Sequence, residues 1–161
     1  MAIDQVSGTG AASMIAIIGV HHAAVNVRNW DESVAFYTDV LGLTFLLEGE
    51  ATGEGIEANT HLEGVRLRFA MFAAGDNRFE LIQYLSPEGR PNDRGVNDTG
   101  QTHIAFVVAD IDEAFKDLSA KGVKFNATPI HIDSGPLAGC AFAYFPDPNG
   151  VLLEIFQEAP S

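Results

Sequence analysis

The sequence predicts an α+β fold: two paired βαβββ modules forming one curved, cup-shaped mixed sheet with helices outside. The first observation is an internal duplication, because the strand and helix that follow His22 recur, with one gap, after His103. The second is the element order, since each half reads as a strand, a capped helix and then three strands. The third is that a sheet of three or four strands cannot bury its open face alone, so the two halves should pair.

Each predicted module begins with a buried strand that runs into an amphipathic helix. The helices are expected over residues 30–41 and 111–121, where apolar residues recur at helical spacing. An N-cap residue, a glutamate three residues later and a terminating glycine bound both helices. These residues are Asn29, Glu32 and Gly42 in the first half, and Asp110, Glu113 and Gly122 in the second.

The other strands are placed by apolar runs between turn residues. They are predicted over residues 17–27, 43–48, 65–73 and 78–85, then from His103 and over 123–125, 141–145 and 151–157. Residues 50–64, rich in Gly, Glu and Thr, are predicted to be a mobile loop near any site. The expected organisation is a tail (1–14), a first module (15–85), a linker (86–100) and a second module (101–158).

Composition narrows the class of partner. Nine Lys and Arg residues stand against 22 Asp and Glu residues, which gives a net charge of -13. Such a surface repels phosphate backbones and anionic lipids, so neither nucleic acid nor a membrane is an expected partner. Cys140 is the only cysteine, which excludes an internal disulfide and predicts a cytoplasmic protein. A small-molecule substrate remains the expected partner.

Two histidines and two glutamates recur at equivalent points of the duplication. Glu80 and Glu154 each interrupt an apolar run on the last strand of a module, and His22 and His103 each stand on a first strand. Alone, each could be an exposed strand residue or a packed histidine, but an ionised carboxylate in such a run needs compensation. Pairing of the modules is expected to bring all four together. Two imidazoles and two carboxylates, completed by water, suit a six-coordinate divalent metal.

Strand alternation predicts which other side chains line the cup. Asn26, Tyr84 and Phe156 share faces with the candidate ligands and are predicted to bind substrate. Arg66 and Arg68 either face the cup, where they could bind a carboxylate, or lie on an exposed face. Turn length decides between these two arrangements, and the sequence leaves the choice open. His21 is expected to point away from His22, with a supporting or packing role.

The chain resembles the vicinal oxygen chelate superfamily, which includes glyoxalase I, methylmalonyl-CoA epimerase, extradiol dioxygenases and bleomycin-resistance-type proteins. The resemblance covers residues 17–157 and is carried by His22 and the segments 36–37, 40–42, 79–81, 102–105 and 147–154. It implies paired βαβββ modules around one divalent metal ion (Ni, Co, Zn, Mn or Fe). The ligand positions implied by the resemblance are His22, Glu80, His103 and Glu154.

The resemblance implies a metal-dependent isomerase, epimerase or lyase that acts on a small carbonyl compound through a metal-stabilised enediolate. Glu154 or Glu80 would then move the proton as catalytic base and acid. One alternative is an Fe(II) extradiol-type dioxygenase, and another is a metal-free binding or resistance protein. Asn26 and Tyr84 stand where glyoxalase I has an arginine and an asparagine, which argues against a glutathione adduct as substrate.

The linker bears on how the two modules meet. Residues 86–100, if extended, could reach about 50 Å, which is enough to return to the adjacent sheet edge. We therefore expect the modules to pair within one chain, so that the site needs no second chain. A homodimer is still expected, formed through other faces.

Overall fold

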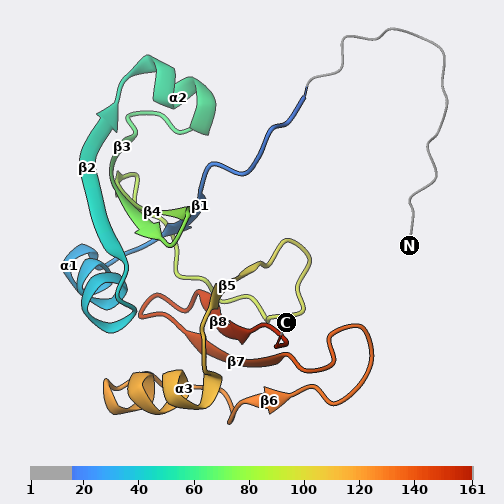
Figure 1. Cartoon of the computed structure of the whole chain (residues 1–161). Helices are drawn as coiled ribbons and strands as arrows, with labels where there is room; N and C mark the ends of the chain where they lie inside the picture. The colour runs from blue at the N-terminus through green and yellow to red at the C-terminus, as the bar shows by residue number, and fades with distance from the viewer. Residues whose placement is uncertain (1–15, 161) are drawn as a thin grey trace, which may run out of the picture.

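The computed structural model describes residues 16–160, which form two α+β modules (Figure 1). Hydrogen-bonded strand order is β1-β4-β3-β2 in the first sheet and β5-β8-β7-β6 in the second. In each sheet the first strand runs parallel to the last, and the other neighbours are antiparallel. The α+β class and the duplicated order are confirmed, with the strands in two four-stranded mixed sheets. The predicted tail, residues 1–14, lies outside the described residues.

The elements occur in the predicted order. The first module contains β1 (Ala23–Asn26), α1 (Trp30–Ala35), the π-helix η1 (Phe36–Val40), β2 (Thr44–Thr52), α2 (Glu54–Thr60), β3 (Arg66–Ala74) and β4 (Asn77–Ser86). The second contains β5 (His103–Val107), α3 (Ile111–Ala120), β6 (Ile130–His131), β7 (Ala141–Pro146) and β8 (Leu152–Gln157). None of the helices within residues 16–160 is long and apolar enough to span a membrane.

The helix caps differ between the two modules. Asp110 accepts a hydrogen bond from the backbone N–H of Glu113 at 2.9 Å, as the capping-box spacing predicts. Asn29 instead donates its amide to the Glu32 carboxylate at 2.8 Å and makes no side-chain cap bond. Gly122 follows α3 with a φ of +95°, a left-handed conformation that a residue with a Cβ rarely adopts.

Three local predictions differ from the structure. The first strand, predicted over residues 17–27, covers only Ala23–Asn26. Residues 50–64 are not a loop, because β2 continues to Thr52 and helix α2 follows it. A hydrogen bond ties the turn after α2 back to the helix, since the Glu57 carboxylate accepts from the backbone N–H of Gly64 at 3.1 Å. Residues 123–125 form no strand. The Phe125 ring packs into the core instead, with its centroid 5.0 Å from that of Phe145.

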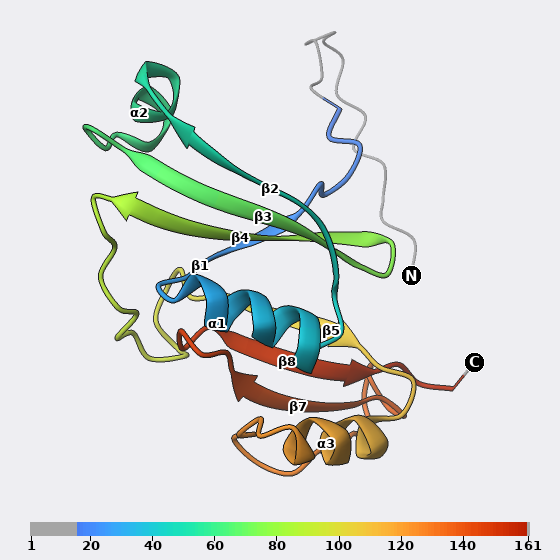
Figure 2. The same cartoon turned by 90° about the vertical axis from the view of Figure 1, so that its left-hand side faces the viewer.

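Contacts between α1–η1 and the second module fix how the modules sit together. Figure 2 shows α1 lying alongside the second module. The hydroxyl of Tyr37, which is fully buried, donates to the Asp147 carboxylate at 3.0 Å. Burial, followed by the Asp147 charge, raises the pKa of Tyr37 far above its usual range. Asn149 donates to the Ser33 hydroxyl at 3.0 Å, and one continuous core contains residues from both modules. Moving one module against the other would break these buried contacts.

Candidate metal centre

The first module places an imidazole against a carboxylate. His22 immediately precedes β1, and Glu80 lies on the neighbouring parallel strand β4, where it pairs with Ala24. The His22 Nε2 and Glu80 Oε2 atoms are 3.1 Å apart. The histidine side chain is 36% exposed and the glutamate side chain 16% exposed, so the pair opens to solvent on the histidine side.

The second module repeats this arrangement. His103 begins β5, and Glu154 lies on the parallel strand β8, where it pairs with Ala105. The His103 Nε2 and Glu154 Oε2 atoms are 3.0 Å apart, and the Glu154 side chain is only 7% exposed. In both modules the histidine stands two residues before the residue that pairs with the glutamate. We call His22 with Glu80 the first half-site and His103 with Glu154 the second.

The spacing within each half-site fits a divalent metal. Two neighbouring ligands of an octahedral ion, each about 2.1 Å from it, lie about 3.0 Å apart. The nitrogen–oxygen distances of 3.1 and 3.0 Å match that separation. Each half-site therefore offers one imidazole nitrogen and one carboxylate oxygen already at the distance that adjacent ligands require.

The two half-sites do not meet in this chain. His103 lines a cavity of about 860 Å³ between the modules, whereas His22 lines a different cavity of about 650 Å³. Within residues 16–160, no group of three or more His, Cys, Asp or Glu side chains is placed to hold a metal ion. This differs from the expectation that pairing inside one chain brings all four residues to one place. The buried contacts that α1 and η1 make with the second module hold the two modules in an orientation that keeps the half-sites apart.

Tyr144 is a site residue that the sequence reasoning missed. It pairs with Glu154 across β7 and β8, and its ring centroid lies 5.4 Å from that of His103. Burial, followed by the charge of Glu154 and a hydrogen bond to it, raises the pKa of Tyr144. Strand alternation over residues 141–146 could have found it. The corresponding residue in the first module is Met71, opposite Glu80, so only the second half-site has a phenol.

The predicted substrate-binding residues do not all lie near one half-site. Asn26 and Tyr84 line the same cavity as His103. Phe156 lies two residues after Glu154 on β8, on the same face of the strand. Arg66 is exposed at the start of β3 and lines neither of the two cavities described above.

Arg68 requires a correction, because it lies on the opposite face of the sheet from Glu80. It shares a strand face with Ala70 and Phe72, both of which are fully buried in the core. Its guanidinium lies 4.4 Å from the centre of the Trp30 ring, and its Nε donates to Gln83 at 2.6 Å. These contacts use the side chain for packing, so it does not reach the face that carries the first half-site.

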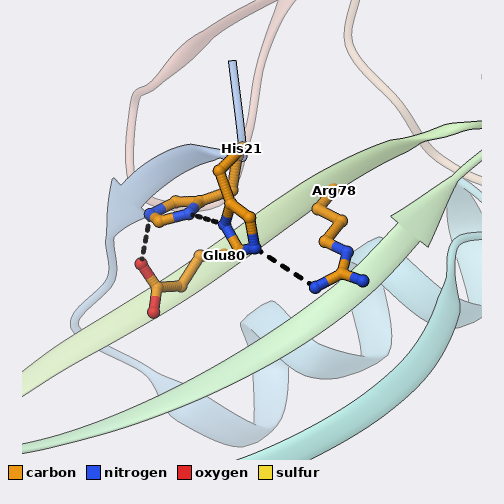
Figure 3. Close-up of polar contacts among 4 residues, drawn as sticks. His21, Arg78 and Glu80 are labelled. Carbon is orange, nitrogen blue, oxygen red and sulfur yellow. Dashed lines mark hydrogen bonds and ion pairs between the residues drawn. The ribbon is translucent and has the colours of Figure 1, made fainter. Parts of the chain in front are cut away.

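His21 is in contact with His22, and Figure 3 shows His21 between Arg78 and the histidine that contacts Glu80. The two Nδ1 atoms are 2.8 Å apart, and the ring planes are nearly perpendicular, at 85°. Nε2 of His21 lies 3.2 Å from Nη1 of Arg78. His21 therefore does not point away from His22, as strand alternation predicted, because residues 21 and 22 precede β1 and are not part of the strand. Its contact with His22 suits a supporting role, but Arg78 was not predicted. Its position two residues before Glu80, on the same face of β4, was the available signal.

Comparison with known proteins agrees with this architecture. A 2-epi-5-epi-valiolone epimerase from Actinomyces sp. is 34% identical over 145 residues, covering 87% of this chain and 79% of the relative. A lactoylglutathione lyase from Arabidopsis thaliana is 22% identical, covering 87% of this chain and 44% of the relative. The crystal structure of a glyoxalase family protein from Bacillus cereus superposes with a TM-score of 0.77 at 22% identity, covering 93% of this chain and all of the other.

The family assignment rests on most of the chain. Residues 19–155 match the model of the Glyoxalase/Bleomycin resistance protein/Dioxygenase superfamily. That stretch includes both half-sites and all eight strands of the two sheets except the last two residues of β8. Three features therefore agree: the duplicated order of the elements, the superposition with a solved glyoxalase-family structure and the match to the family model. The chain belongs to the Glyoxalase/Bleomycin resistance protein/Dioxygenase superfamily.

Proposed function

We propose that this chain is a metal-dependent epimerase or isomerase of a small carbonyl compound. The observation that carries the proposal is the pair of half-sites, each with an imidazole nitrogen and a carboxylate oxygen 3.0–3.1 Å apart. Their mixed nitrogen and oxygen donors suit Ni, Co, Zn, Mn or Fe. The relative named as a 2-epi-5-epi-valiolone epimerase supports epimerisation in particular.

In this proposal the metal centre forms between two chains. A six-coordinate ion held by the first half-site alone would have only two protein ligands, and His103 of the same chain lines a different cavity from His22. Bringing the two together within one chain would break the Tyr37–Asp147 bond and the shared core. A second copy can supply the missing half-site without that cost. A symmetric homodimer would then hold two centres, each with the first half-site of one chain and the second of its partner.

The faces that carry the half-sites favour such a contact. Along β5, His103, Ala105 and Val107 are exposed on one face, and Val107 retains 71% of its accessible surface. Val20, near the first half-site, retains 88%. Burial of these apolar side chains against a second copy would stabilise a dimer. The same contact would remove each metal centre from bulk water.

The two carboxylates suit a proton transfer at carbon. When bound, a divalent ion supplies Lewis acidity that stabilises negative charge on a substrate oxygen. Glu80 and Glu154 would approach from opposite modules, so a carbon held between them would meet one carboxylate on each face. One can remove the proton next to the carbonyl, and the other can return a proton to the opposite face, which inverts that carbon. Asn26 and Tyr84 line the same cavity as His103, which supports a role for them in binding substrate oxygens.

The test is metal-dependent exchange of a substrate hydrogen with solvent. Metal-depleted protein would be restored with each candidate metal and assayed in heavy water. The substrates would be 2-epi-5-epi-valiolone and a panel of small 2-hydroxycarbonyl compounds. We expect epimerisation only with metal present, with deuterium appearing at the carbon next to the carbonyl. Oxygen uptake with catechols, in the absence of any deuterium incorporation, would contradict the proposal and favour a dioxygenase.

A further inference from the structure

A hydrogen-bonded chain of four side chains runs from Arg78 through His21 and His22 to Glu80 (Figure 3). We propose that Arg78, acting through His21, holds the His22 proton on Nε2 and so opposes metal binding at the first half-site. Arg78 and His21 are then positioning residues that control entry of the metal. The metal-binding part of this inference rests on the proposed function, whereas the position of the proton does not.

The donors and acceptors along the chain allow only one direction. A guanidinium can donate hydrogen bonds but cannot accept them. Nε2 of His21, 3.2 Å from Arg78, must therefore be the acceptor, which leaves the proton of a neutral His21 on Nδ1. That Nδ1–H donates to Nδ1 of His22 at 2.8 Å. The proton of a neutral His22 is then on Nε2, from which it donates to Glu80 at 3.1 Å.

Metal binding requires the opposite arrangement. An imidazole that binds a metal through Nε2 has its proton on Nδ1, and this N–H donates to a neighbouring acceptor. For His22 that acceptor is Nδ1 of His21, whose own proton must then be on Nε2. An N–H of His21 would now face an N–H of Arg78 across 3.2 Å. Arg78 must therefore move away before the first half-site can bind a metal through Nε2.

The second half-site has no such chain. Thr102 precedes His103 where His21 precedes His22, and Leu152 stands two residues before Glu154 where Arg78 precedes Glu80. Neither residue can impose a proton position in this way. The structure thus contains two half-sites with the same His–Glu spacing, and only the first is opposed by a cation. We expect the second half-site to bind the metal before the first.

The position of the proton can be measured in the metal-free protein. Nitrogen-15 NMR with long-range proton correlations distinguishes a histidine protonated on Nδ1 from one protonated on Nε2. We expect His22 to carry its proton on Nε2 in the wild-type chain and in Arg78→Lys, because lysine also only donates. In Arg78→Gln the amide oxygen can accept from His21, and a substantial Nδ1-protonated population should appear. An Nδ1-protonated His22 in the wild type, or an Arg78→Gln spectrum like that of the wild type, would overturn the proposal.

Metal affinity gives a second readout. Arg78→Gln should bind Zn²⁺ or Ni²⁺ about threefold to tenfold more tightly than the wild type, the scale of one hydrogen bond. Arg78→Lys should bind like the wild type. In a His21→Ala background, Arg78→Gln should change the affinity less than twofold, because the connection to His22 is gone. An equal gain in that background would mean that the positive charge acts through space, and the proposal would fall. A protein that binds no metal at all would contradict the proposed function instead, and the NMR result would stand independently.

Discussion

Mixing His22→Ala chains with His103→Ala chains is expected to restore activity that neither variant has alone. Each variant removes one imidazole from every centre of its own homodimer. In a mixed dimer both substitutions fall in the same centre, and the other centre has His22 from one chain and His103 from its partner. Random exchange of chains makes about half of the dimers mixed, each with one intact centre of two, so about a quarter of wild-type activity should return.

A second mixture provides the matched control. His22→Ala and Glu80→Ala both alter the first half-site, so every centre in their mixture contains one damaged first half-site. We expect no recovery from that mixture under the same co-refolding conditions. A lack of recovery from His22→Ala with His103→Ala, when size analysis shows that mixed dimers have formed, would contradict a centre shared between chains.

Glu154→Gln is expected to lower kcat by about 10²- to 10⁴-fold, the range that one general base contributes. Glutamine keeps the size of the side chain and can still contact His103, but it cannot take a proton from carbon. Glu80→Gln should lose less activity, because Glu80 is more exposed and has Met71 instead of a tyrosine opposite it. Glu154 is only 7% exposed and has Tyr144 beside it, so the second half-site is the better enclosed.

The measurement separates loss of metal from loss of the base. Metal content and deuterium incorporation from heavy water would be determined for both variants, with Tyr144→Phe as a control that preserves the carboxylate. We expect Glu154→Gln to lose incorporation even where the metal is retained. If incorporation survives in Glu154→Gln and disappears in Glu80→Gln, the roles of the two carboxylates are the reverse of those proposed.

Much of the fold could be predicted because the sequence contains an internal duplication. The repeated strand, helix cap and terminating glycine around His22 and His103 identify two modules of one kind. The same repeat places each histidine against the glutamate of its own module, and the structure has both pairs at hydrogen-bonding distance. These features depend on local order and on neighbouring strands, which a sequence pattern specifies well.

Features that depend on how the modules meet could not be predicted. A linker over residues 86–100 is long enough for pairing within one chain and equally long enough for pairing between chains. Contacts such as Tyr37 with Asp147 decide the orientation, and no periodicity indicates them. The face on which Arg68 lies depends on the turn before its strand. Tyr144 could have been found, because it alternates with the apolar residues of β7.

Counting the imidazole ligands of the bound metal tests the shared centre most directly. X-ray absorption spectroscopy of the wild-type protein loaded with Zn²⁺ or Ni²⁺ reports how many imidazole rings bind each ion, and elemental analysis gives the metal content. If His22 and His103 meet at one centre, each ion has two imidazole ligands and the protein binds one metal per chain. His22→Ala should then leave a single imidazole on whatever metal it still binds. One imidazole per ion in the wild type, with the two half-sites binding separately, would contradict the account.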